Sequence, residues 1–211
     1  MHVAHLWRYP VKSMGGEELS EAAVTEDGIT GDRLVQVVSA SGPYVTSRTH
    51  PQLLLHRATL QDGQIFVDGD MWNSPSVATP VEQSAGRGAR LIRYEGPQRF
   101  DVLPLLIATD GAIRDFGRDY RRLRPNIVIG GVEGLAEREW AGKSLMIGDC
   151  VIAVDSLRMR CVMTTYDPDT AAQDISVLHD IARRYGGQFA LKCDVVRGGT
   201  IRVGDEVTLS S

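Results

Sequence analysis

The chain has 211 residues, a formal net charge of −4 and 43% hydrophobic residues, which is enough for one large domain or two closely packed ones. The acidic balance argues against broad nucleic-acid binding, because that function needs a basic surface to neutralise phosphates. No segment approaches the roughly 20 continuous apolar residues of a membrane-spanning helix, and the N-terminal residues show no secretory pattern. We therefore expect a soluble, cytoplasmic protein with neither nucleic acid nor membrane as a partner.

Strand signals dominate roughly the first eighty residues. Four segments rich in branched and aromatic residues stand between turn formers, at residues 3–11, 34–40, 53–60 and 64–68. Asp-Gly pairs at 27–28, 62–63 and 68–69 are typical of tight turns. Short strands at this spacing predict an antiparallel barrel or sandwich and not an alternation of strand and helix.

The segment that follows predicts a boundary between two parts of the chain. Residues 75–96 lack long apolar runs and contain the sequence Ser84-Ala85-Gly86-Arg87-Gly88. We therefore predict an N-terminal β region over residues 1–85 and a second, closely packed domain over residues 86–211.

Two helices are predicted in the second part. The first begins at Thr109 or Asp110, ends before Pro125 and has apolar residues at helical spacing, namely Ile113, Phe116, Tyr120 and Leu123. The basic residues of its last turns oppose the negative end of the helix dipole and are interpreted as a solvated face, namely Arg118, Arg121 and Arg122. The second helix covers residues 170–185 and stops at Gly186-Gly187.

The remaining segments are predicted to be strands, at residues 126–129, 144–147, 151–159, 189–196 and 200–209. Gly148 and Gly204 each stand before an aspartate and another apolar run, so both are predicted to lie in hairpin turns. The expected fold is mainly β with a few helices.

The cysteine and arginine content of the chain limits the kinds of metal, cluster and anion site that it can form. Three cysteines without a Cys-x-x-Cys pair fit a reducing compartment. They exclude a cysteine-rich zinc ribbon and a self-contained iron–sulfur cluster, so any such cluster would come from a partner. Only three of the 23 basic residues are lysines. This bias reflects either genomic base composition or a need for planar guanidinium groups at a phosphate or carboxylate site.

Cys161 is the strongest candidate for chemistry. It stands beside Arg160 at the end of an apolar strand pattern, and two threonines and a turn follow it. A neighbouring cation stabilises the thiolate, which is the form that attacks electrophiles and binds soft metals. Free cysteine is also a common core residue, and the apolar patterns around Cys150 and Cys193 indicate that role for both. For Cys161 the local sequence leaves both interpretations open.

Five ordered motifs make the chain resemble the MOSC superfamily. They extend over nearly the whole chain and are Tyr9-Pro10-Val11-Lys12-Ser13; Gly28-Ile29-Thr30-Gly31-Asp32-Arg33; Arg124-Pro125-Asn126-Ile127-Val128; Trp140 with Gly142-Lys143 and Ile147-Gly148-Asp149; and Arg160-Cys161 with Thr164-Thr165 and Asp167-Pro168. Each motif alone is weak, whereas five in this order are specific. The chain resembles most the branch with an N-terminal MOSC-associated β-barrel region, which includes the mitochondrial amidoxime reducing component and bacterial reductases of N-hydroxylated compounds.

The resemblance implies a MOSC-type β-barrel preceded by an N-terminal β-barrel-like region, with the molybdenum cofactor (molybdopterin) bound between them. Cys161 matches the cysteine of the family's Arg-Cys-x-x-Thr-Thr pattern, which implies that it is the metal ligand and the catalytic residue. The other matched residues are implied to bind the cofactor, namely Lys12, Ser13, Arg33, Thr109, Arg124, Asn126 and Arg160.

These residue types suit a phosphorylated pterin. Lys12 and the serine after it follow a proline at a strand end, where an ammonium, a hydroxyl and backbone amides can converge on a phosphate. Arg33 and Arg124 offer planar forks, and Asn126 offers both a donor and an acceptor. Thr109 would bring the cofactor to a helix N-terminus. The structural alternatives are a solvated Lys12, an Arg33 that caps a turn and a Thr109 that serves only as an N-cap.

The activity implied by the resemblance is a molybdenum-dependent reduction of N-hydroxylated or other N-oxygenated small substrates. Since no predicted strand is followed by a Gly-x-Gly-x-x-Gly fingerprint, we expect electrons from a separate ferredoxin- or flavodoxin-like protein. Two alternatives stay open: a cofactor carrier or sulfur-delivery protein that uses Cys161, and a thiol enzyme without molybdenum. No acid or base stands out, and Tyr166 and Asp167 are the nearest candidates.

Overall fold

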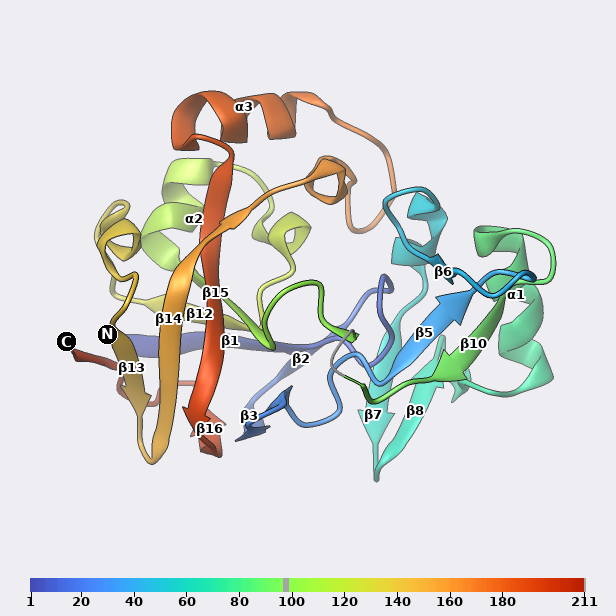
Figure 1. Cartoon of the computed structure of the whole chain (residues 1–211), viewed down its shortest axis with the longest axis horizontal. Helices are drawn as coiled ribbons and strands as arrows, with labels where there is room; N and C mark the ends of the chain where they lie inside the picture. The colour runs from blue at the N-terminus through green and yellow to red at the C-terminus, as the bar shows by residue number, and fades with distance from the viewer. Residues whose placement is uncertain (97–98, 211) are drawn as a thin grey trace.

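The computed structural model describes residues 1–96 and 99–210 of the chain (Figure 1). The strands are β1 (His2–Arg8), β2 (Glu17–Leu19), β3 (Glu21–Thr25), β4 (Gly28–Ile29), β5 (Val35–Val38), β6 (Tyr44–Val45), β7 (Ala58–Gln61), β8 (Gln64–Val67), β9 (Asp70–Met71), β10 (Arg90–Arg93), β11 (Leu105–Thr109), β12 (Ile127–Gly130), β13 (Ser144–Ile147), β14 (Cys150–Met159), β15 (Gln188–Arg197), β16 (Gly199–Arg202) and β17 (Thr208–Ser210). The α-helices are α1 (Pro75–Ala85), α2 (Asp110–Phe116) and α3 (Ser176–Tyr185), and the 3-10 helices are η1 (Pro51–Leu55), η3 (Tyr120–Leu123), η4 (Ala136–Glu139) and η5 (Val162–Thr165). The predicted class, mainly β with a few helices, is confirmed.

Eight strands form one large sheet in the order β17-β13-β14-β15-β11-β12-β1-β2. Neighbouring strands are antiparallel except for β11 and β12, which run parallel. The first strand of the chain therefore lies inside a sheet built mostly by the second half. Figure 1 shows the two termini close together, and Met1 O accepts a hydrogen bond from Val207 N at 2.9 Å.

The main core lies against this sheet, because alternate side chains of a strand point to the same face. β14 buries Cys150, Ile152 and Val154, and β15 buries Leu191 and Cys193 in the same cluster. The expected structural role of Cys150 and Cys193 is thus confirmed. Burial raises the pKa of Cys150 to about 11 and also raises the pKa of Cys193, so neither thiol ionises readily near neutral pH.

A smaller body holds most of the residues between β5 and β10 (Figure 1). It contains the sheet β10-β5-β6, the sheet β7-β8-β9 and helix α1. These elements share one apolar core, which includes Val35, Val37, Leu53, Val77 and Val81. The strand predicted over 53–60 is wrong in its first half, because Pro51 starts the helix η1 and pairing as β7 begins only at Ala58.

The segment predicted as a boundary forms a helix and a strand of this smaller body. The buried residues of α1 are Val77, Val81 and Ala85, which lie on one helix face because they are spaced by four. β10 then pairs with β5 and places Leu91 opposite Val37. α1 and β10 thus pack on one core from either side of the proposed division at residues 85 and 86, which stays a prediction.

A hydrogen-bonded chain of three side chains ties α1 to the smaller body. His56 Nε2 lies 2.8 Å from Ser84 Oγ, and His56 Nδ1 lies 2.6 Å from Asp68 Oδ2. The side chains follow one another in the order Asp68, His56, Ser84, as in the catalytic triad of a hydrolase. Ser84, however, lies in the last turn of α1, where the backbone groups left unpaired are carbonyls, and these cannot stabilise an oxyanion. The next two glycine amides already donate to Glu82, so they cannot hold an oxyanion. The hydrogen bonds among these three side chains therefore have a structural role, which is to hold α1 on the smaller body.

The first predicted helix breaks at Gly117. α2 ends at Phe116, Gly117 takes a left-handed conformation with φ 65°, and η3 follows. Thr109 caps α2, because its Oγ1 accepts a hydrogen bond from Ala112 N at 3.2 Å. The break redirects the chain before it reaches Arg124, which immediately follows η3.

The second predicted helix begins later than expected, at Ser176. Asp167 Oδ1 accepts hydrogen bonds from the backbone N–H groups of Asp169 and Thr170, both at 3.1 Å. Ala171 then takes a left-handed backbone conformation with φ 57°, which ends this turn before a helix can continue from it. The residues after η5 therefore form a loop that connects η5 to α3.

The two predicted hairpin turns differ in outcome. The turn at Gly148 is confirmed, since Ile147 pairs with Cys150 across β13 and β14. The strand predicted over 200–209 splits instead at Gly204, because β16 pairs with β3 whereas β17 pairs with β13. The second turn thus carries the chain from one sheet to another.

Candidate functional site

A cleft with a volume of about 120 Å³ lies where the large sheet meets the smaller body. Its walls come from segments around residues 12–13, 33, 46–48, 100–106, 122–126 and 158–163, together with Lys192. The structure brings seven of the eight sequence-predicted site residues to this cleft, namely Lys12, Ser13, Arg33, Arg124, Asn126, Arg160 and Cys161. The cleft is the candidate functional site.

Cys161 lies at the end of β14 with an exposed side chain. The backbone N–H of Arg160 donates to Gly187 O at 2.9 Å, which holds the residue before Cys161 to the start of β15. The Cys161 carbonyl accepts hydrogen bonds from Thr164 N at 3.1 Å and Thr164 Oγ1 at 2.9 Å, which starts the helix η5. Its exposure distinguishes Cys161 from the two buried cysteines and leaves this thiol accessible to a ligand.

The cleft is strongly cationic although the protein is acidic overall. Among the residues that the structure describes, its lining holds eight arginine and lysine side chains and one carboxylate, that of Asp101. Positive charge gathered in one concave site raises the local concentration of anions. The site is therefore suited to an anionic ligand.

Two of these arginines have nitrogens that lack a partner. Arg124 Nη2 and Arg160 Nε are buried and form no hydrogen bond with any described residue. Burial lowers the pKa of Arg124 and of Arg160 to about 10, so both stay protonated near neutral pH. Buried donors without acceptors are unfavourable by about 1–3 kcal/mol each, and more when charged. An anionic ligand in the cleft would supply the missing acceptors.

Three non-glycine residues of the cleft have a left-handed backbone. The φ angles are 74° for Ser13, 55° for Arg33 and 56° for Arg124. Such conformations are uncommon outside glycine and concentrate at functional sites, where the surrounding structure holds them in place. The strain supports a binding role for this part of the cleft.

A buried hydrogen-bond network stands behind Arg33 and Asn126. The Asp32 carboxylate is fully buried, pairs with the Arg33 guanidinium and accepts from Tyr9 N at 2.7 Å. Asn126 Nδ2 donates to Asp32 Oδ2 at 3.3 Å, and Asn126 Oδ1 accepts from Leu106 N at 3.2 Å. The Asn126 amide therefore supports the scaffold of the cleft, and its predicted contact with a pterin stays a prediction.

Thr109 is the one predicted site residue that the structure does not bring to the cleft. It is fully buried, and its Oγ1 donates to Glu137 Oε2 at 3.2 Å in addition to capping α2. Of the two alternatives weighed for Thr109, the structure favours the N-cap.

The two acid or base candidates near Cys161 are also engaged elsewhere. Tyr166 donates to Arg48 O at 3.5 Å, and the Asp167 carboxylate pairs with Arg122 at 2.9 Å. Neither residue lines the cleft. Both contacts instead hold the loop that follows Cys161.

Sequence reasoning missed an ion cluster at the cleft. Asp101 pairs with Lys12 at 3.1 Å, with Arg158 at 3.6 Å and with Arg48. Burial alone would raise the pKa of Asp101, but the three cations outweigh it and hold this pKa below its ordinary value. Arg48 also contacts the Cys161 side chain. Arg48 and Asp101 stand in loops without a periodic pattern, so no sequence signal marks them.

A metal held here would have few protein ligands. Among residues 1–96 and 99–210, no three His, Cys, Asp or Glu side chains are grouped so that they could hold a metal ion.

The chain is similar over nearly its whole length to curated proteins that are mitochondrial by name. It is 26% identical to Mitochondrial amidoxime-reducing component 1 of Mus musculus, over 98% of this chain and 82% of that protein. It is 27% identical to Mitochondrial amidoxime reducing component 2 of Homo sapiens, over 97% of this chain and 82% of that protein. The YUAD protein from Bacillus subtilis, 14% identical, has a similar crystal structure with a TM-score of 0.54, covering 100% of this chain and 95% of that one. This last likeness shows a shared fold.

The prediction of a cytoplasmic protein is wrong. It rested on the missing secretory pattern, whereas the relatives that match nearly the whole chain are mitochondrial by name. Within the described part of the chain, no helix is long and apolar enough to cross a membrane.

Two family descriptions match the chain in sequence order. Residues 1–99 match the MOSC N-terminal beta barrel domain, and residues 110–208 match the MOSC domain. Together they include Cys161 and every other residue that the sequence motifs assigned to the cleft. The chain therefore belongs to the MOSC family, with a MOSC N-terminal beta barrel domain in front of its MOSC domain.

Proposed function

We propose that this protein is a molybdenum-cofactor-dependent oxidoreductase that reduces N-hydroxylated or other N-oxygenated small molecules. The observation that carries the proposal is the exposed thiol of Cys161 on a cleft lined by eight cations. This combination suits a ligand with a soft metal at one end and a phosphate at the other. The match to relatives named as amidoxime-reducing components supports the reaction class.

The residues of the cleft fit such a cofactor. Arg124 and Arg160 would give their unpartnered nitrogens to its anionic part, and Lys12 would add an ammonium beside the strained Ser13. Cys161 would bind the metal as its thiolate. When bound, the cofactor supplies a redox-active metal able to accept an oxygen atom from the substrate.

The neighbours of Cys161 would orient the substrate. Arg48, which contacts the Cys161 side chain, can donate hydrogen bonds to a substrate oxygen, because a guanidinium carries several donors in a fixed plane. Asp101 is ionised near neutral pH and can accept a hydrogen bond from a substrate N–H or O–H group. The two residues are paired with each other, so each would hold the other's orientation.

We further propose that electrons come from a separate ferredoxin- or flavodoxin-like protein. The three cysteines lie apart, two of them in the core and one at the cleft, and no dinucleotide fingerprint follows a strand. The second candidate function is a cofactor carrier or sulfur-delivery protein. It is favoured by the same exposure of Cys161, which would let the thiol hand a ligand to another protein.

One experiment separates these functions. The protein is produced in cells that make the molybdenum cofactor, its molybdenum content is measured, and it is then assayed with a hydroxylamine or an amidoxime and reduced viologen. Metal binding with turnover supports the reductase. Stoichiometric metal without turnover of any N-oxygenated substrate favours the cofactor carrier. Absence of bound molybdenum contradicts the reductase and the cofactor carrier and leaves only sulfur delivery.

A further inference from the structure

Cys161 and Arg124 stand at the ends of two strands that are not neighbours. Cys161 follows β14 and Arg124 precedes β12, and the sheet order places β15 and β11 between these strands. Three strand spacings of about 4.8 Å separate the two strand ends by roughly 14 Å. No ladder hydrogen bond therefore joins β14 and β12 directly, and the sheet relates the two segments only through β15 and β11.

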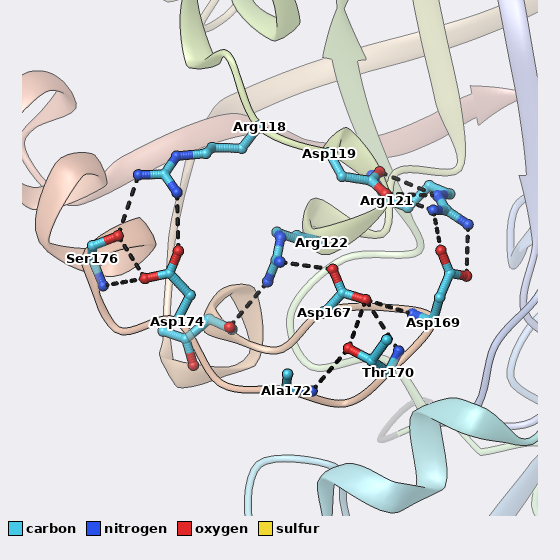
Figure 2. Close-up of polar contacts among 11 residues, drawn as sticks. Arg118, Asp119, Arg121, Arg122, Asp167, Asp169, Thr170, Ala172, Asp174 and Ser176 are labelled. Carbon is cyan, nitrogen blue, oxygen red and sulfur yellow. Dashed lines mark hydrogen bonds and ion pairs between the residues drawn. The ribbon is translucent and has the colours of Figure 1, made fainter.

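Three arginines before β12 bridge this gap to three aspartates in the loop after Cys161 (Figure 2). The pairs run in antiparallel order: Arg118 with Asp174 at 3.0 Å, Arg121 with Asp169 at 2.6 Å, and Arg122 with Asp167 at 2.9 Å. We call these six residues the arginine clamp. The sequence-based interpretation of the three arginines as a solvated face is wrong for Arg122, whose side chain is 11% exposed, whereas Arg118 and Arg121 stay about one-third exposed although they are paired across this gap.

The inner pair of the clamp is the most buried. The Arg122 side chain is 11% exposed and that of Asp167 is 30% exposed, compared with 36% and 62% for Arg121 and Asp169. Arg122 Nη1 also donates to Thr165 O at 3.0 Å, so this guanidinium holds both the loop and the end of η5. A buried ion pair whose guanidinium makes two hydrogen bonds fixes the relative position of the segments that it joins, whereas exposed pairs contribute little to stability.

A second arginine ties the same two segments in the opposite direction. Arg160 Nη2, from the segment that carries Cys161, donates to Leu123 O at 2.8 Å, directly before Arg124. Arg122 and Arg160 both line the cleft. Each side of the cleft thus contributes one guanidinium group that is hydrogen-bonded to the other side.

We infer that Arg122 and Asp167 are the positioning pair of this site. They fix the segment of Cys161 against the segment of Arg124, so that one bound group meets the thiolate and the anion-binding arginine at the correct separation. The inference rests on the proposed function, in which Cys161 binds the metal and Arg124 binds the anionic part of the cofactor. The pair itself acts through the segments it joins and need not contact the substrate.

The first test uses cofactor-free protein. Amide hydrogen exchange is measured for Thr164 and Tyr166, whose N–H groups bond within η5 and at its end. Arg122→Gln and Asp167→Asn should each speed this exchange at least tenfold. The matched control is Arg183→Gln, which makes the same charge change at a residue that is 78% exposed and pairs with Asp180 on α3. Unchanged exchange in both clamp variants would overturn the inference.

The second test measures molybdenum per folded chain after production in cofactor-competent cells. We expect at least a tenfold loss in Arg122→Gln and Asp167→Asn, an intermediate loss in Arg122→Lys, and wild-type content in Arg183→Gln. Lysine can keep the contact with Asp167, but its single ammonium nitrogen lacks the planar fork by which two arginine nitrogens reach Asp167 and Thr165 O separately, which is why its rescue is partial. A lower Tm with normal molybdenum content in the folded fraction would show a purely structural pair and overturn the inference. If wild-type protein binds no molybdenum, the proposed function fails, while the exchange result still reports on the pair.

Discussion

The guanidinium carbon of Arg124 lies 4.1 Å from the centroid of the Tyr9 ring, so this buried tyrosine supports one of the arginines of the cleft that has an unpartnered nitrogen. Arg33 approaches the same ring at 5.3 Å. Burial raises the pKa of Tyr9 despite the two cations, so the ring stays a neutral phenol. Tyr9, the residue that directly follows β1, thus supports the arginines of the anion site.

Two substitutions of Tyr9 should separate the contribution of its aromatic ring to cofactor binding from the contribution of its hydroxyl to stability. Tyr9→Phe removes only the hydrogen bond to Pro125 O, at 3.3 Å, and should lower the free energy of unfolding by about 1 kcal/mol with nearly normal molybdenum content. Tyr9→Leu also removes the face under Arg124 and should reduce that content several-fold. Urea unfolding and metal analysis measure the two effects. Equal molybdenum content in both variants would show that the ring does not support binding.

Cys161→Ser should abolish a molybdenum–thiolate absorption signal and the reductase activity while leaving the fold intact. The reason is that this side chain is exposed and makes no core contact, so its loss leaves no cavity. Cys193→Ser is the contrasting control, because it places a hydroxyl in the apolar core and should lower Tm without removing the signal. Visible spectra, turnover and thermal unfolding provide the measurements. A folded Cys161→Ser protein with wild-type activity would refute the ligand assignment.

Lys12 and Arg33 should behave differently when replaced by alanine, although the sequence predicts the same role for both. Arg33→Ala leaves the fully buried Asp32 carboxylate without its cation and should destabilise the fold by about 3–5 kcal/mol. Lys12→Ala leaves Asp101 with Arg48 and Arg158, so Tm should change little while cofactor retention falls roughly tenfold. The double change Asp32→Asn with Arg33→Ala should recover part of the lost stability. Without that recovery, the buried charge is not the cause.

How far the sequence predicts the site depends on the kind of signal each residue carries. Cys161, Arg124 and Lys12 stand in ordered motifs, and the structure brings all three to one cleft. Arg48 and Asp101 stand alone in loops, and only the tertiary fold places them beside Cys161 and Lys12. Pairing between distant loops leaves no local pattern, so one sequence could not reveal it.

The same distinction holds for the fold. Strands with alternating apolar residues, such as β14, are predicted within a few residues of their ends. α1 was missed because its apolar stripe has only three residues and Pro80, a residue that disfavours helix interiors, stands inside it. The long helix predicted before Arg124 was wrong because Gly117 can adopt φ 65°. The arginine clamp was read as a solvated face because its aspartates lie some 45–56 residues away along the chain.

The Asp101 cluster should make stability depend on pH in the acid range. Because the folded pKa of Asp101 lies below its ordinary value of 3.8, the carboxylate stabilises the fold above that pH and loses this contribution as pH falls through the folded pKa. Asp101→Asn should therefore be less stable than wild type at pH 7, with the difference shrinking below pH 3.8. Unfolding curves across this range measure it. A difference that stays constant with pH would show that the charge of Asp101 is not involved.

The last prediction concerns the source of electrons. Cys150 and Cys193 are buried in the core and Cys161 stands alone at the cleft, so the three thiols cannot share a four-ligand cluster. No predicted strand is followed by a glycine-rich dinucleotide fingerprint, which leaves no recognisable site for NAD(P)H. The homogeneous, molybdenum-loaded protein should therefore reduce a hydroxylamine with reduced viologen but not with NAD(P)H alone. Addition of a ferredoxin or flavodoxin with its reductase should restore turnover with NAD(P)H, because the reductase takes the hydride and the carrier then delivers the electrons one at a time. Turnover with NAD(P)H alone would contradict the proposal of a separate electron donor.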